Sequence, residues 1–271
     1  MTRCLSLAVC ATLVSLVLPI PARAADEQPI KCLLVLGGCC HDYEHQKDVL
    51  VKGISERTNI VFTVAYDPNT TTGHKNPVYD KEDWYKGFDV VIHDECSDAI
   101  KDLDFINRIL DPHKKGLPAV NLHCAMYCYR SAPYPNTTPW MEFTGMNTNH
   151  HGQQRPIEIK FTDKESPITK GMADWTTMQE ELYHPQIDLL PTAHALASGH
   201  QNVQREADAT VIWTNDYHGT RVFSTTLGHN TKTVADARYL DLVTRGLLWS
   251  LNKLDDQHLK KVPAPATPEK K

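Results

Sequence analysis

The chain has 271 residues, of which 28 are lysine or arginine and 33 are aspartate or glutamate, giving a formal net charge of −5. An acidic chain without a basic stripe is a poor candidate for binding nucleic acid, so no nucleic-acid partner is expected. The length suits one large α/β domain with a substantial hydrophobic core.

The two ends of the chain are expected to lie outside this domain. Residues 1–24 have the pattern of a secretory signal peptide: Arg3, a short apolar run (LSLAVCATLVSLVLPI), and the small-x-small cleavage pattern Ala22-Arg23-Ala24. We therefore expect export to the periplasm or the extracellular space, with no membrane anchor after cleavage. Cleavage would remove two arginines and leave 247 residues, 26 of them basic and 33 acidic. A single α/β domain is predicted over 25–257, and a disordered tail rich in Pro, Ala and charge over 258–271.

The first half of the mature chain alternates short apolar strands with amphipathic helices. Residues 30–38 (IKCLLVLGG) form an apolar run ended by two glycines, which is typical of a buried strand. The same criteria predict helix 44–58, strand 59–65, strand 88–93, helix 99–115 and strand 117–122. Continuous apolar strands of this kind indicate a parallel sheet with helices on both faces. We therefore expect a flavodoxin-like, doubly wound and mostly parallel α/β fold.

After residue 130 the pattern changes. Residues 155–161 (RPIEIKF) alternate with a period of two, which indicates an antiparallel or edge strand. Further elements are expected in the order strand 195–197, strand 210–214, a hairpin turn at Gly219, strand 221–227 and a closing helix over 235–251. The C-terminal half is thus expected to add antiparallel strands to the sheet.

Histidines accompany the ends of several predicted strands. His41 follows the first strand, His93 ends the third, His123 follows the fourth, and His229 follows the strand over 221–227. In a parallel α/β sheet the carboxyl ends of the strands meet at one edge, where ligands bind. Four histidines at such positions, out of 14 in the chain, are more than chance placement would give. They indicate a functional site at that edge.

A series of short motifs resembles the ThuA-like, trehalose-utilisation family. In chain order the motifs are Gly37-Gly38 with His41, Leu122-His123-Cys124-Ala125, His150-His151-Gly152, PITKG over 167–171, EELY over 180–183, and a C-terminal stretch that runs from Arg221 through Leu227-Gly228-His229 to RGLLW over 245–249. Each motif is weak alone, but the ordered series covers nearly the whole mature chain. The resemblance implies a class I glutamine amidotransferase-like fold and a link to carbohydrate metabolism, without defining a reaction.

The glutaminase chemistry of that fold does not match the residues present. It needs a cysteine nucleophile on a strained strand-to-helix turn, usually between glycines, with a histidine base and an acid that orients it. Cys124 stands at a suitable strand end, but His123 and Ala125 flank it. His229 is a candidate base, yet Thr231 stands where the acid would be. We therefore expect no functional glutamine amidotransferase.

Metal coordination suits the histidines better, because imidazoles and carboxylates are ordinary ligands of zinc and related divalent ions. The candidate ligands of a zinc or manganese ion are His41, His123 and His229, with His151 and His184 as further candidates. Glu181 and His184 lie three residues apart and would face the same way if that segment were helical. The alternative for each histidine is a packing or capping role.

The same groups can also act without a metal. His123, His229 and Glu181 are candidate general acids and bases, acting on a sugar hydroxyl or on a carbon beside a carbonyl. The candidate substrate-binding residues are Tyr127, Arg130, Trp140 and Asn230. Aromatic faces suit the apolar side of a pyranose, and Trp140 follows a Pro-rich loop that could overhang the site. Arg130 can hold an anionic group or pair with an acidic side chain.

Six cysteines remain after signal cleavage: Cys32, Cys39, Cys40, Cys96, Cys124 and Cys128. In an oxidising compartment some should form disulfides, and six cysteines allow 15 connectivities. All except the first follow strands that are predicted to end at the same edge, and one hypothesis joins Cys40 to Cys128. For His93, Asp94 and Glu95, which follow the third strand, a helix-capping acidic turn is expected rather than a catalytic role. Exposed side chains are expected at Glu44, His45 and His74.

These observations leave more than one functional interpretation. The first is an exported enzyme that acts on a glycoside or a keto-sugar by hydrolysis, elimination or isomerisation. The alternative is a non-catalytic carbohydrate- or partner-binding module on the same fold, and a third interpretation is a thiol or redox protein that uses the clustered cysteines. The expected partner in the first interpretation is a small carbohydrate ligand. Fold alone does not choose among them.

Overall fold

A computed structural model of the chain describes residues 28–130, 138–187, 189–203, 207–260 and 262. The predicted signal peptide over 1–24 and the Pro-rich loop over 132–135 lie outside these residues, so both remain predictions. Within the described ranges, no helix combines the length and the apolar character needed to cross a membrane.

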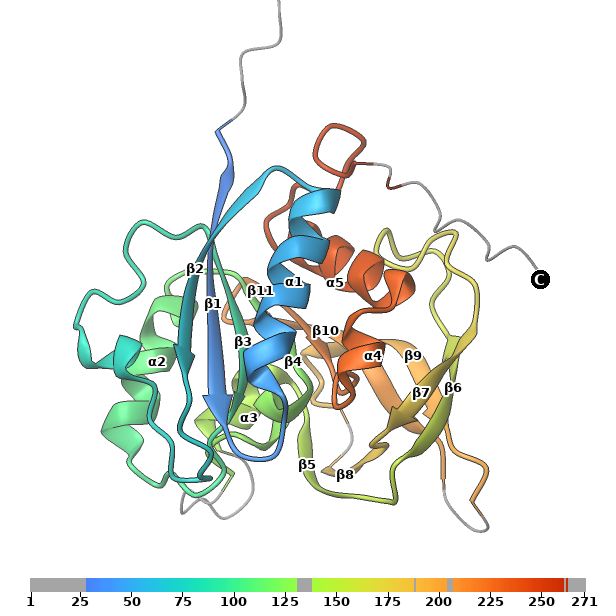
Figure 1. Cartoon of the computed structure of the whole chain (residues 1–271), viewed down its shortest axis with the longest axis horizontal. Helices are drawn as coiled ribbons and strands as arrows, with labels where there is room; N and C mark the ends of the chain where they lie inside the picture. Colours follow the sequence, from blue (N-terminus) through green and yellow to red (C-terminus); the bar gives the residue numbers. More distant parts are fainter. Residues whose placement is uncertain (1–27, 131–137, 188, 204–206, 261, 263–271) are drawn as a thin grey trace, which may run out of the picture.

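A nine-stranded sheet forms the centre of the molecule, in the order β2-β1-β3-β4-β11-β10-β9-β6-β7 (Figure 1). Five neighbouring strands run parallel: β2 (Ile60–Asp67), β1 (Ile30–Gly38), β3 (Val90–Cys96), β4 (Ala119–Leu122) and β11 (Thr220–Thr225). The order 2-1-3-4 at this end is that of a flavodoxin-like sheet. The predicted doubly wound α/β fold is therefore confirmed.

The other end of the sheet is antiparallel, as the second half of the sequence predicts. It consists of β10 (Ala209–Tyr217), β9 (Ala193–His200), β6 (Arg155–Phe161) and β7 (Trp175–Glu180). A separate antiparallel pair joins β5 (Asn147–His151) to β8 (Tyr183–Ile187). Neither member of this pair nor β7 was predicted, because their sequences (NTNHH, YHPQI and WTTMQE) lack a clear apolar period.

Helices cover both faces of the parallel half. On one face, α1 (Tyr43–Arg57) packs beside α5 (Ala237–Ser250), which the short α4 (Thr231–Val234) precedes (Figure 1). On the other face lie α2 (Leu103–Lys114), α3 (Pro139–Thr144) and the short 3₁₀ helix η1 (Pro77–Asp80). Successive residues of a strand point to opposite faces, so Leu34 belongs to the first core and Leu33 to the second.

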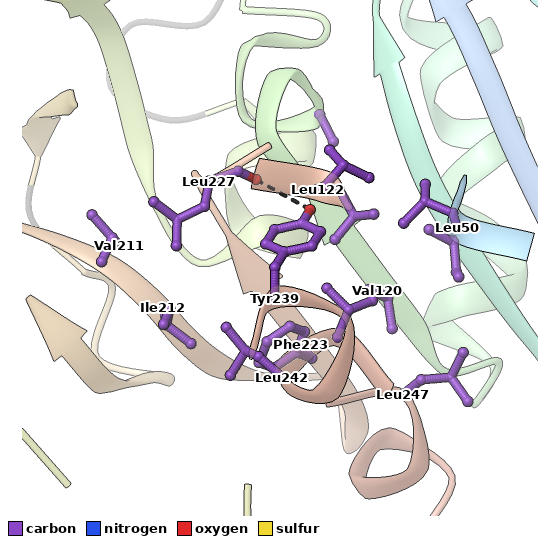
Figure 2. Close-up of a cluster of buried hydrophobic side chains, with 14 of the residues drawn as sticks. Leu50, Val120, Leu122, Val211, Ile212, Phe223, Leu227, Tyr239, Leu242 and Leu247 are labelled. Atoms are coloured by element: carbon purple, nitrogen blue, oxygen red, sulfur yellow. Dashed lines mark hydrogen bonds between the residues drawn. The ribbon is translucent and has the colours of Figure 1, made fainter. Parts of the chain in front are cut away.

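The core under α5 holds the carboxyl ends of the central strands in place. Leu50 of α1, Leu122 of β4 and Phe223 of β11 meet Leu247 of α5 in one cluster (Figure 2). The helix approaches so closely that a Cβ at Gly246 would lie 2.4 Å from Cγ of the Phe223 ring. Burying each large apolar side chain contributes about 1.5–3 kcal/mol. The core therefore fixes the sheet edge to which the functional side chains are attached.

The folded domain extends past its predicted boundary at residue 257. The backbone N–H of Lys260 donates to the carbonyl of Arg57 at 2.7 Å, and the Lys260 ammonium donates to the carbonyl of Thr58 at 3.0 Å. Residues 258–260 therefore belong to the domain and not to the tail.

Candidate functional site

Three histidines and one glutamate from distant parts of the chain converge at the carboxyl edge of the parallel strands. His41 follows β1, His123 follows β4, His229 follows β11 and Glu181 follows β7. Each residue offers one nitrogen or oxygen atom, and these four atoms all lie within 4.8 Å of one another. The structure thus brings together three of the four histidines that the sequence placed at one edge, together with the predicted catalytic residue Glu181, whereas His93 is buried in the core.

His123 is held by the turn that follows β4. It begins the 3₁₀ helix η2 (His123–Tyr127) with a φ of 44°, an uncommon conformation for a residue other than glycine. Its Nδ1 donates to the carbonyl of Thr226 at 2.7 Å, so Nε2 is left as an acceptor that faces the cluster. The Tyr183 hydroxyl lies 3.2 Å from this Nε2. Burial raises the pKa of Tyr183 well above its ordinary value, so the hydroxyl keeps its proton and donates.

His41 faces His123 across a short gap. Their Nε2 atoms are 2.9 Å apart, while His41 Nδ1 lies 3.1 Å from both the Cys39 carbonyl and the Tyr43 hydroxyl. When His41 Nδ1 donates to Cys39, both Nε2 atoms present lone pairs to each other, and a proton or a cation between them relieves the repulsion. Burial lowers the pKa of His41 well below its ordinary value, and His123 and His229 lower it further. This ring is therefore neutral near pH 7, the form that binds metals.

Glu181 supplies the negative charge of the cluster. Its Oε2 lies 3.5 Å from His123 Nε2, and its Oε1 lies 3.2 Å from His229 Nδ1. Burial raises the pKa of Glu181, but the neighbouring His123 and His229 imidazoles outweigh burial and hold the pKa far below its usual range. For His229, burial lowers the pKa, and the hydrogen bond and charge of Glu181 raise it overall. Glu181 is thus a permanent carboxylate beside the imidazoles.

The loop that carries His229 is clamped from two sides. The buried Glu180 carboxylate accepts the backbone N–H groups of Gly228, His229 and Asn230 at 3.2, 3.0 and 2.9 Å. The buried Gln46 amide donates to the carbonyls of Gly228 and His229 at 3.1 and 3.2 Å. At Gly228, with φ 128°, a Cβ would lie 2.9 Å from the Tyr239 hydroxyl.

Glu180 and Gln46 were not predicted to have a role at the site. The only sequence signal is that Glu180 directly precedes Glu181 in the EELY motif. Because β7 ends here, the first carboxylate turns toward the loop and the second toward the histidines.

A cavity of about 210 Å³ opens beside the cluster. The lining includes His41, Glu181, Tyr127, Arg130, His151 and Tyr183. Two larger hollows, of about 570 and 530 Å³, lie elsewhere on the surface and contain none of the four converging residues. We therefore assign the site from its chemistry and not from cavity size.

Two predicted substrate-binding residues line this cavity. Tyr127 stacks on Tyr183 with ring centroids 4.2 Å apart, and the Arg130 guanidinium carbon lies 4.3 Å from the Tyr127 ring centroid. Arg130 Nε donates to the Asp98 carboxylate at 2.6 Å. The positive charge of Arg130 is therefore balanced within the protein, which suits polar uncharged groups better than a free anion.

The other two predicted substrate-binding residues serve the fold. Trp140 is fully buried, and its indole N–H donates to the carbonyl of Ala125 at 2.8 Å, so it offers no face to a ligand. The side chain of Asn230 accepts the backbone N–H of Lys232 at 2.9 Å and caps α4. Trp140 thus packs against η2 and stabilises it, and Asn230 is the N-cap of α4, the helix that follows His229.

The two further candidate metal ligands, His151 and His184, lie in different places. His151 Nε2 lies 3.6 Å from Glu181 Oε2 at the rim of the cavity, with 37 % of its side chain exposed. His184 lies on strand β8 and stacks on His150 with ring centroids 5.2 Å apart. The helical spacing assumed for Glu181 and His184 is wrong. In an extended segment, residues three apart face opposite sides, so Tyr183 and not His184 joins the cluster.

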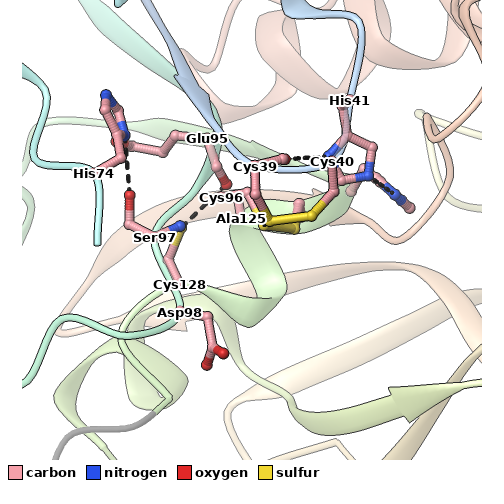
Figure 3. Close-up of a disulfide and its surroundings, with 12 residues drawn as sticks. Cys39, Cys40, His41, His74, Glu95, Cys96, Ser97, Asp98, Ala125 and Cys128 are labelled. Atoms are coloured by element: carbon pink, nitrogen blue, oxygen red, sulfur yellow. Dashed lines mark hydrogen bonds between the residues drawn. A yellow bond between two sulfur atoms is a disulfide. The ribbon is translucent and has the colours of Figure 1, made fainter. Parts of the chain in front are cut away.

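The cysteines pair differently from the hypothesis. Disulfides join Cys39 to Cys40 (Figure 3) and Cys96 to Cys124. Cys128 is a buried free thiol whose sulfur accepts the backbone N–H of Ser97 at 3.3 Å and donates to the carbonyl of Glu95 at 3.1 Å. The proposed bond between Cys40 and Cys128 is therefore wrong. As a disulfide partner, Cys124 is not a nucleophile in this state.

Two expectations away from the site are also wrong. His93, Asp94 and Glu95 form no capping turn but lie inside β3, which runs to Cys96. His74, expected at the surface, is fully buried between Asp67 and Ser97. His45, by contrast, is exposed as expected and pairs with Asp42.

The donor set at the edge fits a divalent cation. It combines three imidazoles with an ionised carboxylate, a mixture that zinc, manganese and iron accept. Two rings are oriented through their outer nitrogens, His123 by the Thr226 carbonyl and His41 by the Cys39 carbonyl. Metal-binding histidines are commonly oriented in this way.

Fold and site together define a flavodoxin-like α/β protein with a histidine- and carboxylate-rich centre at the carboxyl edge of its sheet. Residues 32–250 match the ThuA family profile, which is described as trehalose utilisation. The chain belongs to this family. No curated protein matches the sequence significantly.

Solved structures share the fold at low identity. A putative ThuA-like protein from Parabacteroides merdae is 20 % identical with a TM-score of 0.60, covering 87 % of this chain and 94 % of that one. A putative ThuA-like protein from Bacteroides uniformis is 16 % identical with a TM-score of 0.61, covering 89 % and 98 %. A β-galactosidase from Rahnella sp. R3 is 14 % identical with a TM-score of 0.54, covering 83 % of this chain and 32 % of the galactosidase.

Proposed function

We propose that this chain is an exported, metal-dependent enzyme of carbohydrate metabolism. In this proposal His41, His123, His229 and Glu181 hold one divalent ion, zinc or manganese. The observation that carries the proposal is the convergence of these four donor atoms within 4.8 Å of one another beside an open cavity. The family's description, trehalose utilisation, supports a carbohydrate as the substrate class.

The residues around the cavity support binding of a neutral sugar. Arg130, its charge balanced by Asp98, presents N–H donors to hydroxyl or carbonyl oxygens. The ring of Tyr127 stacks on Tyr183, and the Arg130 guanidinium also lies over this ring. Tyr127 is therefore held in place as a wall of the cavity. These groups orient a small glycoside or keto-sugar against the cluster.

The chemistry assigned to the site is hydrolysis, elimination or isomerisation. A bound divalent ion supplies Lewis acidity that polarises a sugar oxygen. Glu181 stays ionised and therefore serves as a ligand and not as a proton donor. Tyr183 keeps its proton, and its hydroxyl lies 3.2 Å from His123 Nε2, where it borders the proposed ion site. His151 is the cavity histidine most open to solvent, so it is the group through which protons exchange with water.

The first test is elemental analysis of protein purified without chelators, followed by a turnover screen with disaccharides and their keto derivatives. We expect one equivalent of zinc or manganese and turnover that chelation abolishes. Glu181→Gln should weaken metal binding at least about 100-fold, because it removes a ligand charge without changing the size of the side chain. His45→Gln, at an exposed site, is the matched control.

The outcomes of these measurements are distinct. A metal-free protein, or a Glu181→Gln variant with full metal content and activity, would overturn the proposal. Sugar binding without turnover would indicate the non-catalytic module instead. Export is tested separately by N-terminal sequencing of the secreted protein, which should begin at Ala25.

A further inference from the structure

Four cysteine sulfurs gather on one side of the cavity, next to His41. Cys39 and Cys40 follow β1, Cys96 ends β3, and Cys124 lies in the first turn of η2. The two disulfides nearly touch, with Cys39 Sγ 3.6 Å from Cys96 Sγ (Figure 3). All four residues line the 210 Å³ cavity. The proposed carbohydrate chemistry uses none of these sulfurs.

One of the two disulfides lies within reach of an imidazole. Cys96 Sγ, Cys124 Sγ and one ring nitrogen of His41 all lie within 4.8 Å of one another. Two thiolates and an imidazole are a donor set for zinc and for other thiophilic cations such as Cu⁺. While the sulfurs are bonded to each other they lack the thiolate charge that binds a metal. In the oxidised state these residues therefore do not bind a metal as thiolates.

We propose that Cys96, Cys124 and His41 form a second metal site, selective for thiophilic cations, that opens when the Cys96–Cys124 disulfide is reduced. An external dithiol supplies the two electrons: its two S–H groups become a disulfide, and two protons pass to the cysteine sulfurs. A divalent cation then displaces those two protons. His41 also belongs to the His/Glu cluster, formed by His41, His123, Glu181 and His229, so the two sites are coupled through the His41 ring.

The surroundings favour such a site. Cys96 and Cys124 are 4 % and 3 % exposed, so a bound ion would be shielded from bulk water, and the cavity provides the path for its entry. The carbonyl of Cys39 lies 3.1 Å from His41 Nδ1, and the same ring contacts Tyr43, so the imidazole is already oriented. Both sulfurs are anchored at the ends of central elements, β3 and η2, and not in an exposed loop.

The experiment uses Co²⁺ as a spectroscopic probe. The full-length protein is reduced with dithiothreitol, desalted without oxygen and titrated with Co²⁺, alongside untreated protein. The reduced protein should develop a thiolate-to-cobalt charge-transfer band that saturates at one equivalent, and the untreated protein should show none. Cys124→Ser should lose the band. Cys128→Ser is the matched control and should keep it, because this buried thiol binds Ser97 and Glu95 and lies outside the donor set.

Further measurements keep the result interpretable. The Glu181→Gln variant should retain the band, because Glu181 is not in the thiolate donor set. This variant therefore distinguishes loss of metal binding at the His/Glu cluster from loss at the thiolate site. If Cys124→Ser does not fold, alkylation of the reduced wild-type protein replaces it, and Co²⁺ should protect Cys96 and Cys124 but not the exposed Cys40, which lies outside the donor set. Absence of the band in reduced protein, or equal alkylation with and without Co²⁺, would overturn the proposal.

Discussion

Two pairs of histidines lie against the same sheet and differ in their surroundings. At the carboxyl edge, the Nε2 atoms of His41 and His123 are 2.9 Å apart. On the α2 face, the Nε2 atoms of His93 and His113 are 3.1 Å apart. The first pair meets two further donor residues beside a cavity that His41 lines, whereas both members of the second pair are fully buried and line none of the described cavities.

The second pair is explained by hydrogen bonds alone. His113 Nδ1 donates to the carbonyl of Leu117 at 2.7 Å, which leaves its Nε2 to accept a hydrogen bond from His93 Nε2. On the other side of His93, Glu95 lies 3.1 Å from Nδ1 and also accepts the Tyr79 hydroxyl at 2.5 Å. This chain of donors and acceptors stabilises the core without an ion. The distance between two imidazoles therefore does not identify a metal site, and the proposal for the first pair rests on its additional donors and its cavity.

The largest expected effect comes from removing one histidine from each pair. His93→Ala leaves Tyr79, Glu95 and His113 buried without their partner and should lower the free energy of unfolding by roughly 3–5 kcal/mol. His41→Ala, at the partly exposed member of the first pair, should abolish metal binding and turnover with a much smaller loss of stability. Urea unfolding of the chelated proteins and elemental analysis measure both quantities. Equal destabilisation by the two substitutions, or metal loss in a stable His93→Ala variant, would contradict the comparison.

A smaller effect is expected from the clamp on the His229 loop. Glu180→Gln weakens the acceptor of three backbone N–H groups, so His229 should be less well positioned and metal affinity should fall about 10–100-fold. Competition with a chelator measures this affinity. Glu158→Gln, on the exposed side of β6, is the control and should bind metal like the wild type. Unchanged affinity in Glu180→Gln would show that the clamp does not position the site.

The smallest effect concerns the pH dependence of stability. Burial and the neighbouring His93 lower the pKa of His113 from 6.5 to about 3. The unfolded state therefore binds more protons between these values, so His113 stabilises the protein above pH 6.5 and this contribution is lost as the pH falls toward 3. The loss is about 1.4 kcal/mol for each pH unit.

His113→Asn keeps a donor for Leu117 but does not titrate, so its stability should fall less steeply than that of the wild type. Chemical unfolding of chelated protein between pH 7.5 and 5 measures the two slopes. His194→Asn, at an exposed position, should follow the wild-type slope. Parallel slopes for wild type and His113→Asn would show that His113 does not carry this dependence.

An element could be predicted from the sequence when neighbouring residues alone carry its signal. The apolar run over 30–38 predicted β1 because burial on both faces leaves a continuous apolar pattern. The predicted strand 88–93 ends three residues short of the observed end of β3, because Asp94 and Glu95 are polar although the strand continues to Cys96. Glu95 is accommodated in the core by contacts with His93 and Tyr79.

The site residues show the same division. His41, His123 and His229 could be proposed because each follows a recognisable strand of a parallel sheet. Trp140 could not be placed, because its burial depends on the Ala125 carbonyl of η2. Glu180 and Gln46 both hydrogen-bond to the loop that carries His229. This loop is about 50 residues from Glu180 and at least 182 residues from Gln46 in the sequence, so no local pattern predicts these contacts.

The sequence by itself determined the parallel half of the sheet, its covering helices, and the edge at which the histidines would lie. Apolar periodicity and strand-end chemistry are properties of neighbouring residues, so they can be read without knowing the fold. Only the tertiary structure decided which histidines converge, which sulfurs pair, and which polar groups are buried in the core. Those outcomes depend on side-chain direction and on contacts between distant segments, which packing alone establishes.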